Sequence, residues 1–242
     1  MRYAIFADIH SNLEAYQAFL EDAKKEKIDR YFCVGDIVGY GADPRECIEL
    51  TKSLNCPVVC GNHDWAVVNK LSTDYFNEYA KEAVIWTQER LDDIDKNYLN
   101  NLDCVYQDDE LTLVHGSLKD PKEFDYVTDR KSAHIVLSMQ DTRLCFIGHT
   151  HVPGMFYYTE EGDLDYRYAP RLNLKKEDHY LINVGSIGQP RDGDWRACYS
   201  IYDTEKYIIQ LKRLEYDVKK ASEKIEKAGL PKRLSDRILA GR

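Results

Sequence analysis

The sequence has no long hydrophobic run, no paired cysteine motif and no strongly basic segment, and each absence excludes a class of protein. No apolar stretch approaches the roughly 20 residues that a membrane-spanning helix needs. The chain reaches Asp8 after a short apolar stretch, so we expect no secretory signal peptide. The seven cysteines are scattered, which argues against a zinc knuckle or a thioredoxin-type site and favours a reducing, cytoplasmic location.

The charge balance is acidic. The 242 residues include 33 Lys and Arg against 42 Asp and Glu, which gives a formal net charge of -9. Phosphate backbones are bound by clustered basic residues, so a long nucleic acid is disfavoured as a partner. Repeats and Pro- or Ser-rich linkers are also lacking, and the length is sufficient for a large buried core. We therefore expect one domain over residues 1–242, with no membrane association.

Short apolar runs followed by polar or glycine-containing turns recur along the chain and predict buried strands. These runs cover residues 3–7, 31–34, 58–60, 111–114, 144–147 and 181–184. Helical spacing over residues 13–25 follows a capping-box pattern of Ser11 and Glu14. The pair Asp43-Pro44 predicts the start of a second helix through about residue 53. Alternation of strands and helices predicts an α/β fold whose early strands are parallel.

The later sequence changes character. Residues 73–102 read as a helical insertion, which we expect to shape a pocket together with the loop over residues 117–129. Two hairpins are predicted, one over residues 155–168 and one over 197–211, and helical segments close the chain over 218–228 and 231–240. The aromatic late hairpins could form a dimer face or pack on the sheet, so a homo-oligomer is left open.

Polar side chains gather where the predicted strands end. Five of the seven histidines follow apolar runs in this way, whereas His134 and His179 match no motif. In open α/β sheets this edge binds ligands, and the nitrogen and oxygen donors found there suit divalent metals. A spacing of two residues, in Asp8-x-His10 and again in His149-x-His151, would place each pair on one face of an extended strand. The number of donors suggests two metals that share a carboxylate, and Asp36 is the candidate bridge. The polar residues that follow the predicted strands are Asp8, His10, Asp36, Asn62, His63, Asp64, His115, His149 and His151.

Taken in order, these motifs resemble the calcineurin-like metallophosphoesterase superfamily. The segment from Asn183 to Arg191 resembles its small prokaryotic branch, which is related to diadenosine tetraphosphatases and simple phosphodiesterases. The resemblance implies a four-layer αββα sandwich with mixed sheets and a dinuclear site. It assigns one metal to Asp8, His10 and His151, the other to Asn62, His115 and His149, and the bridge to Asp36. Mn²⁺ is the first expectation, with Fe, Ni, Zn and Co as alternatives.

The function expected from this resemblance is metal-dependent hydrolysis of a small phosphodiester or nucleotide by a metal-bridging hydroxide, with the metals about 3.5–4 Å apart. A dinucleoside polyphosphate hydrolase and a protein Ser/Thr phosphatase are alternatives on the same site. The acidic balance disfavours a nuclease. A non-catalytic scaffold is disfavoured because all seven ligand positions and His63 are present.

Four further residues receive expected roles at this site. His63 is the candidate general acid for the leaving group, and Asp64 would hold its imidazole and raise its pKa, although Asp64 could instead cap a helix. Asn12 would donate to a phosphate oxygen, or else cap the helix over residues 13–25. Arg191 would clamp a distal phosphate, or else be an ordinary surface arginine.

Overall fold

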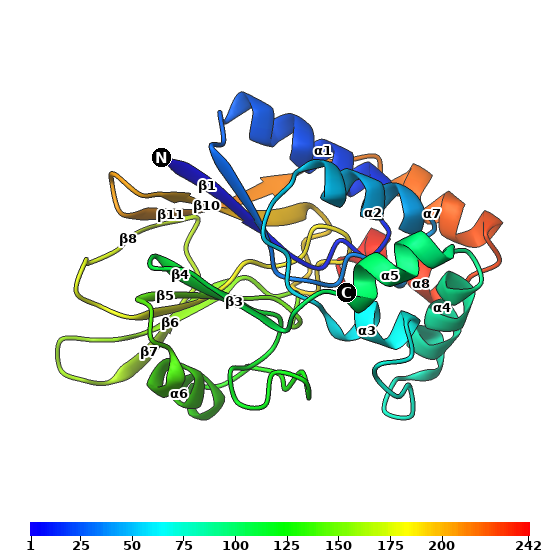
Figure 1. The fold of residues 1–242 in the computed structure, drawn as a ribbon. Coiled ribbons are helices and arrows are strands. Elements are labelled where there is room, and N and C mark those ends of the chain that lie inside the picture. Colours follow the sequence, from blue (N-terminus) through cyan, green and yellow to red (C-terminus); the bar gives the residue numbers. More distant parts are fainter.

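A computed structural model describes residues 1–242 and shows two mixed β-sheets packed face to face (Figure 1). The first sheet has the order β2-β1-β10-β11-β8 and the second the order β3-β4-β5-β9-β6-β7. The strands of the first sheet are β1 (Arg2–Phe6), β2 (Arg30–Cys33), β8 (Arg171–Asn173), β10 (Ala197–Asp203) and β11 (Ile208–Leu214). Those of the second are β3 (Val105–Gln107), β4 (Leu111–Val114), β5 (Leu144–Ile147), β6 (Gly154–Tyr158), β7 (Leu164–Arg167) and β9 (Tyr180–Asn183).

Helices cover the outer faces of both sheets, so the predicted four-layer αββα sandwich is confirmed (Figure 1). Helices α1 and α2 lie over the first sheet and α6 lies over the second, while the others gather at one end of the sandwich. The helices are α1 (Leu13–Lys25), α2 (Pro44–Ser53), α3 (Asn62–Val67), α4 (Glu78–Gln88), α5 (Asp93–Asn100), α6 (Arg130–Met139), α7 (Val218–Lys227) and α8 (Lys232–Ala240).

Strand β1 shows how the apolar pattern builds these layers. Successive side chains of a strand point to opposite faces. Ala4 and Phe6 therefore pack with α1 on the outer side, whereas Tyr3 and Ile5 join the core between the two sheets. Because β1 is buried on both faces, it reads as a continuous apolar run rather than an alternating one.

Strands β1 and β2 are parallel, as are β4, β5 and β9, and the remaining neighbours are antiparallel. Both predicted hairpins are present, β6 with β7 and β10 with β11, but they belong to different sheets. The predicted strand over residues 58–60 is wrong. That segment makes only two isolated bridges, one from Val58 to Cys33 of β2 and one from Val59 to Asp103, which lies outside the strands.

The start of α1 also differs from the prediction. Ser11 adopts a left-handed backbone with a φ of 54° and cannot form the expected capping box with Glu14. Asn12 caps the helix instead, because its Oδ1 accepts a hydrogen bond from the Ala15 backbone N–H at 3.2 Å. Helix α2 begins at Pro44, directly after Asp43, as predicted.

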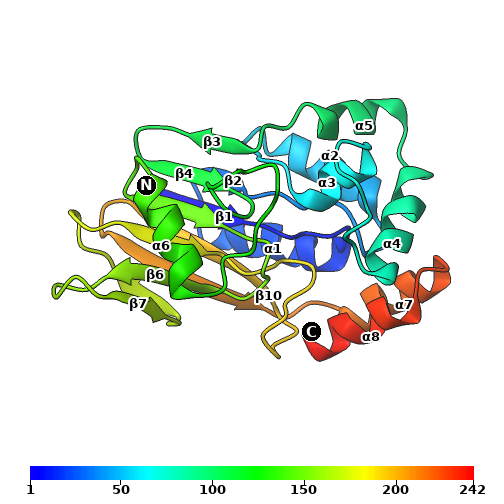
Figure 2. The ribbon, with the colours of Figure 1, turned by 90° about the horizontal axis from the view of Figure 1, so that it is seen from below.

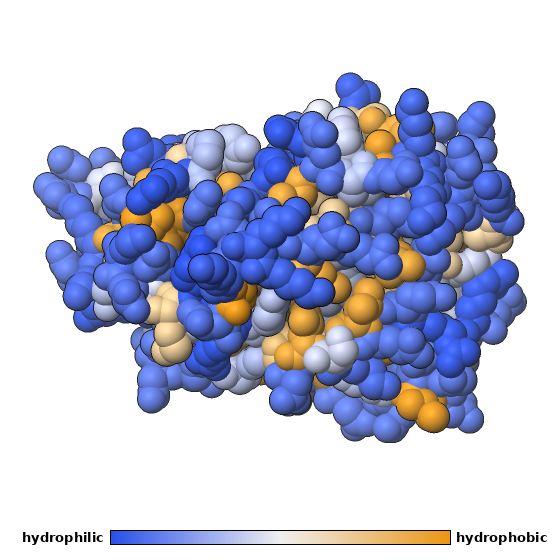
Figure 3. Space-filling model, turned by 90° about the horizontal axis from the view of Figure 1, so that it is seen from above, coloured by the Kyte–Doolittle hydropathy of each residue, from blue (hydrophilic) through white to orange (hydrophobic).

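The expected insertion over residues 73–102 contains α4 and α5, which pack beside α3. The two C-terminal helices pack against each other, and α7 also contacts α1 (Figure 2). No helix combines the length and the apolar character needed to cross a bilayer. Seen from above, the surface is mostly hydrophilic and its apolar residues form separate patches (Figure 3).

Candidate metal centre

The turns that follow β1, β2, β4 and β5 bring acidic and imidazole side chains into one buried cluster. The side chains of Asp8, His10, Asp36, His115 and His151 are each exposed by no more than 1%. These turns come from both sheets, so the cluster lies where the two sheets end together. The sequence prediction that polar side chains gather at strand ends therefore holds for this group.

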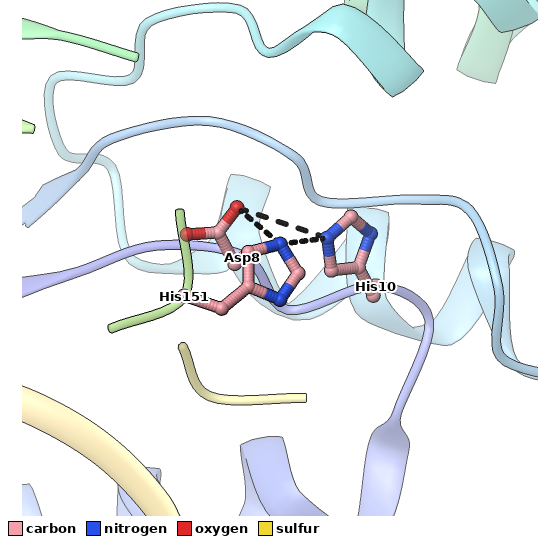
Figure 4. A group of neighbouring side chains, drawn as sticks. All are labelled: Asp8, His10 and His151. Atoms are coloured by element: carbon pink, nitrogen blue, oxygen red, sulfur yellow. Dashed lines mark hydrogen bonds and ion pairs between the residues drawn. The ribbon is translucent and has the colours of Figure 1, made fainter. Parts of the chain in front are cut away.

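The first part of the cluster consists of Asp8, His10 and His151 (Figure 4). Asp8 Oδ1 lies 3.2 Å from His151 Nε2 and 3.7 Å from His10 Nε2. The two imidazole Nε2 atoms are 3.1 Å apart. Three donor atoms therefore face one small volume.

The second part consists of Asp36, His115 and His149, whose donor atoms lie within 4.8 Å of one another. Asp36 Oδ2 is 3.3 Å from His115 Nε2 and 3.6 Å from His10 Nε2. The Asp36 carboxylate therefore lies between the two groups, which is the placement that a shared ligand requires. Asn62, at the start of α3, lines a cavity that Asp36 and His149 also line.

Backbone carbonyls orient three of these imidazoles. The Nδ1 atoms of His10, His115 and His151 lie 3.1, 2.7 and 2.5 Å from the carbonyl oxygens of Val38, Val34 and Gln189. A carbonyl only accepts hydrogen bonds, so each Nδ1 carries the hydrogen and each Nε2 is left to act as a donor to a metal.

Several atoms that face this volume have no hydrogen-bond partner although they are buried. They are Asp8 Oδ1, Asp36 Oδ2, Asn62 Oδ1 and His115 Nε2. A buried polar atom without a partner in the protein costs free energy, so a cluster of them indicates a place where a ligand binds. The set contains only nitrogen and oxygen donors, which fits divalent cations. The residues present therefore fit two metals that share Asp36.

The electrostatics of the cluster also favour a bound cation. Burial opposes protonation of His115, but the charges of Asp36 and Asp8 outweigh it and raise the pKa of His115 to about 9. The carboxylates thus create a local potential that attracts positive charge. A divalent cation would replace the proton in this role.

The backbone of the ligand turns departs from what the spacing predicted. Asp8, His10, His149 and His151 have φ angles of 55°, 49°, 65° and 61°, and Asp36 has 55°. Left-handed backbone is strained for residues other than glycine and concentrates at functional sites. The expectation that each two-residue pair shares one face of an extended strand is wrong, because β1 and β5 have already ended. His149 and His151 belong to different groups of donors, whereas Asp8 and His10 belong to the same group.

Asp64 does not hold His63, contrary to expectation. Its Oδ1 accepts hydrogen bonds from the backbone N–H groups of Ile37 (2.9 Å) and Val38 (3.2 Å). Its Oδ2 accepts from those of Asp36 (2.9 Å) and Gly61 (3.0 Å). The alternative role of Asp64 as a helix-capping carboxylate is closer to the structure. Asp64 caps the start of α3 at Gly61, and it also binds the backbone of the turn that carries Asp36.

His63 lines the cavity beside Tyr40, with the two ring centroids 4.4 Å apart. Burial lowers the pKa of His63 to about 4. The negative charge of Asp36 opposes this shift, and the positive charge of Arg191 adds to it. The expected increase in its pKa is therefore absent in the ligand-free protein. Gly39 is required here, because a Cβ at this position would lie 2.5 Å from His63 Nδ1.

The two expected substrate-binding residues are placed differently from each other. Asn12 caps α1, and its Nδ2 donates to the Gly188 carbonyl oxygen at 2.8 Å, so its polar atoms are engaged within the protein. Arg191 lines the cavity, and its Nη2 donates to Gln189 Oε1 at 3.0 Å. Only Arg191 is thus placed to reach a substrate.

The cavity beside the cluster has a volume of about 420 Å³ and an apolar wall that sequence reasoning missed. Leu71, Tyr75, Phe76, Phe124 and Tyr126 form this wall. Phe76 and Tyr126 come from the two segments, 73–102 and 117–129, that were expected to shape a pocket. The ring of Tyr126 stacks on His149 with centroids 3.9 Å apart, although half of Tyr126 is exposed. No local motif marks these aromatic residues.

Comparison with known proteins gives concordant matches. The family model for the calcineurin-like phosphoesterase superfamily domain matches residues 1–207. Uncharacterized protein MJ0912 of Methanocaldococcus jannaschii is 42% identical over an alignment of 248 positions. The alignment covers 99% of this chain and 98% of that protein. The crystal structure of a metallophosphoesterase from Sphaerobacter thermophilus is 39% identical with a TM-score of 0.87, covering 100% of this chain and 99% of that one. Hypothetical protein PH1004 from Pyrococcus horikoshii OT3 shares the fold at 22% identity, with a TM-score of 0.81 over 100% and 98% of the two chains.

Proposed function

Because the chain belongs to the calcineurin-like phosphoesterase superfamily and is a phosphoester hydrolase, we propose that it uses two divalent metals to hydrolyse a small phosphodiester or nucleotide. The observation that carries this proposal is the set of buried, unpartnered donor atoms around Asp36. Two of these residues, Asp36 and Asn62, line a cavity of about 420 Å³, a size that suits a small organic ligand rather than a polymer.

Each donor group has a place in this proposal. Asp8, His10 and His151 would hold one metal, Asn62, His115 and His149 the other, and Asp36 both. When bound, the two cations would activate the attacking water and neutralise charge on the phosphate oxygens. We propose Mn²⁺ as the metal, with Fe, Ni, Zn and Co as alternatives, since this donor set accepts all of them.

The protein's own residues would supply the remaining steps. His63 is proposed to give a proton to the leaving oxygen. Its imidazole is neutral near pH 7 in the free protein because its pKa is about 4, so the negative charge of a bound phosphate has to raise that pKa before the proton is available. Asp64 would act indirectly, by fixing the turn that positions Asp36. Arg191 would contact a phosphate group through its guanidinium.

The aromatic wall supports an organic substituent on the phosphate. Tyr75 and Tyr126 are exposed by 97% and 54%, and both line the cavity next to the candidate ligands. Aromatic rings of this kind stack on nucleobases or aryl groups. This favours nucleotides and aryl diesters over inorganic phosphates as substrates.

A metal-supplemented activity screen tests the proposal. Purified protein would be assayed with Mn²⁺, Fe²⁺, Ni²⁺, Zn²⁺ or Co²⁺ against monoesters, diesters, cyclic nucleotides, dinucleoside polyphosphates and a phosphopeptide. We expect turnover of bis-p-nitrophenyl phosphate that disappears on chelation. Complete inertness with every metal and ester would favour a non-catalytic scaffold, and preference for the phosphopeptide or for long DNA would favour a protein phosphatase or a nuclease.

Two further expectations stay predictions. A cytoplasmic location rests on the scattered cysteines, and a homo-oligomer rests on the aromatic late hairpins. Fractionation of the source cells and light scattering of the purified protein would test them.

A further inference from the structure

Two arginines from distant parts of the chain converge on Tyr40 beside the metal centre. The Cζ atoms of Arg191 and Arg237 lie 5.8 and 5.9 Å from the centroid of the Tyr40 ring. Arg191 belongs to the loop after β9 and Arg237 to α8. A backbone hydrogen bond of 2.9 Å from Gly193 to the Gly241 carbonyl oxygen joins that loop to the end of α8 (Figure 2).

Neither arginine has an acidic side chain as a partner. Most other arginines of the protein form ion pairs with Asp or Glu, as Arg45, Arg196 and Arg213 do. The side chain of Arg191 donates hydrogen bonds only to Gln189 and, at 3.5 Å, to the Tyr40 hydroxyl. Arg237 donates from Nε to the Arg242 main-chain oxygen at 2.8 Å, which leaves both of its terminal nitrogens without a partner.

This arrangement is unfavourable in the free protein. Both arginines are half-buried, and two like charges close together in such a place cost free energy. Burial, together with the charge of Arg191, lowers the pKa of Arg237. The acidic groups of the metal centre would be neutralised by its cations, so they could not offset the two guanidinium groups. An anion that binds between the two guanidinium groups would offset their positive charge.

Tyr40 links the two arginines to the metal centre. Its ring lies 4.7 Å from that of His10 and 4.4 Å from that of His63, centroid to centroid. Arg191 lines the cavity beside the metal centre, and Arg237 lines an adjoining cavity that shares Asn77 with it. An anion bound by both arginines would therefore lie next to an ester held at the metals. Guanidinium groups match phosphate geometry with two parallel hydrogen bonds, so phosphate is the anion that such a pair favours.

We propose that Arg191 and Arg237 form a second phosphate subsite, so that the preferred substrates carry a further phosphate linked to the one that is hydrolysed. This inference deepens the proposed function and rests on it. It places a determinant of substrate choice on α8, outside the residues 1–207 that the family model matches. Nucleoside polyphosphates and dinucleoside polyphosphates have the required chemistry, whereas simple diesters lack the second phosphate.

Binding to the metal-free protein tests the subsite without relying on catalysis. Isothermal titration with tripolyphosphate would compare the unmodified protein with Arg237→Gln, Arg237→Lys and the control Lys232→Gln. Lys232 is exposed and starts the same helix, so its change removes one charge without touching the proposed subsite. Circular dichroism would establish that each variant is folded.

We expect Arg237→Gln to weaken tripolyphosphate binding by about ten-fold, the effect of one lost charged hydrogen bond. Arg237→Lys should weaken it less, because the charge remains and the paired geometry is lost. Lys232→Gln should change it by less than about two-fold. Equal losses in Arg237→Gln and Lys232→Gln would reduce the effect to general electrostatics and overturn the proposal, as would unchanged binding in Arg237→Gln.

A second measurement separates this inference from the proposed function. For the metal-loaded enzyme, the ratio of kcat/KM for a dinucleoside polyphosphate to that for a nucleotide p-nitrophenyl ester should fall about ten-fold in Arg237→Gln. If this ratio is unchanged while both esters are hydrolysed, the subsite is wrong and the proposed function stands. If the unmodified enzyme hydrolyses no ester with any of the metals, the proposed function fails, and the titration still decides the subsite.

Discussion

The Asp64 carboxylate accepts a hydrogen bond of 2.9 Å from the backbone N–H of Asp36, the residue placed to bridge the two metals. The same carboxylate binds the next two N–H groups of that turn and the N–H of Gly61 at the start of α3. Burial and the charge of Asp36 raise the pKa of Asp64 to about 7. Asp64 therefore positions a candidate ligand and does not touch the reacting groups.

Replacement of Asp64 tests this positioning role. Asp64→Asn exchanges an acceptor oxygen for a donor amide, which leaves some of these buried N–H groups without partners. We expect a loss of about 1–3 kcal/mol in the free energy of unfolding and weaker Mn²⁺ binding. Thermal melting and titration with Mn²⁺ would measure both, with the exposed Asp163→Asn as the control. Full metal affinity in a destabilised Asp64→Asn protein would reduce the role of Asp64 to folding alone.

His63 tests the proposed proton donor. His63→Ala should keep its metals, because the seven proposed ligands are intact, but should lose most of its turnover, about 100-fold or more. The loss should be greatest for esters whose leaving groups have a high pKa, since these depend most on a proton. Steady-state rates across a series of aryl and alkyl esters would show this slope. His134→Ala, at an exposed position with no role in the site, is the matched control. A uniform loss across leaving groups would assign His63 to binding instead of proton transfer.

The apolar pattern was sufficient to predict most strands and helices and where polar groups gather, whereas the four layers were implied by the family resemblance. Strand β1 shows why the strands were predictable: its continuous apolar run is typical of a strand that is buried on both faces. Capping was less predictable, since Ser11 and Asn12 both suit a helix start. Ser11 has a left-handed φ, as its neighbour His10 does, and the capping residue is Asn12.

The site was predictable in its ligand types but not in its geometry. The two-residue spacing of Asp8 with His10, and of His149 with His151, did not indicate that all four residues adopt a left-handed backbone. Asp64 carries no local sign that three of its four hydrogen-bond donors, those of residues 36–38, come from far along the chain. The pairing of Arg191 with Arg237 depends on how α8 docks, which no short motif encodes.

Gly61 gives a steric test of the bridging position. A Cβ at residue 61 would lie 2.0 Å from Asp36 Oδ1, so Gly61→Ala must displace that carboxylate. We expect fewer bound metals per chain, measured by elemental analysis after gel filtration, and a lower melting temperature. Gly162→Ala is the control, because its φ of 86° strains an alanine although nothing lies within 4 Å of the new Cβ. That variant should lose stability and keep its metals. Equal metal content in the two variants would remove Asp36 from the bridge.

Glu26 tests the acid stability of the fold away from the site. Hydrogen bonds from Lys212 and Arg2, each 2.6 Å long, lower the pKa of Glu26 below its ordinary value of 4.5. A carboxylate with a lowered folded pKa stabilises the protein above its unfolded pKa, and this contribution is lost as the pH falls through the folded value. Glu26→Gln should therefore cost about 1 kcal/mol near pH 7, a modest value because the pair is partly exposed.

The difference between Glu26→Gln and the unmodified protein should shrink as the pH falls from about 5 towards 3, where both chains carry a neutral side chain at residue 26. Urea denaturation at a series of pH values would measure it. Glu82→Gln, at an exposed position of α4 with no cationic partner, should show almost no difference at any pH. A difference for Glu26→Gln that stays constant with pH would mean that the glutamate acts through packing of its side chain, and that its charge contributes nothing to holding β1 and β11 against the end of α1.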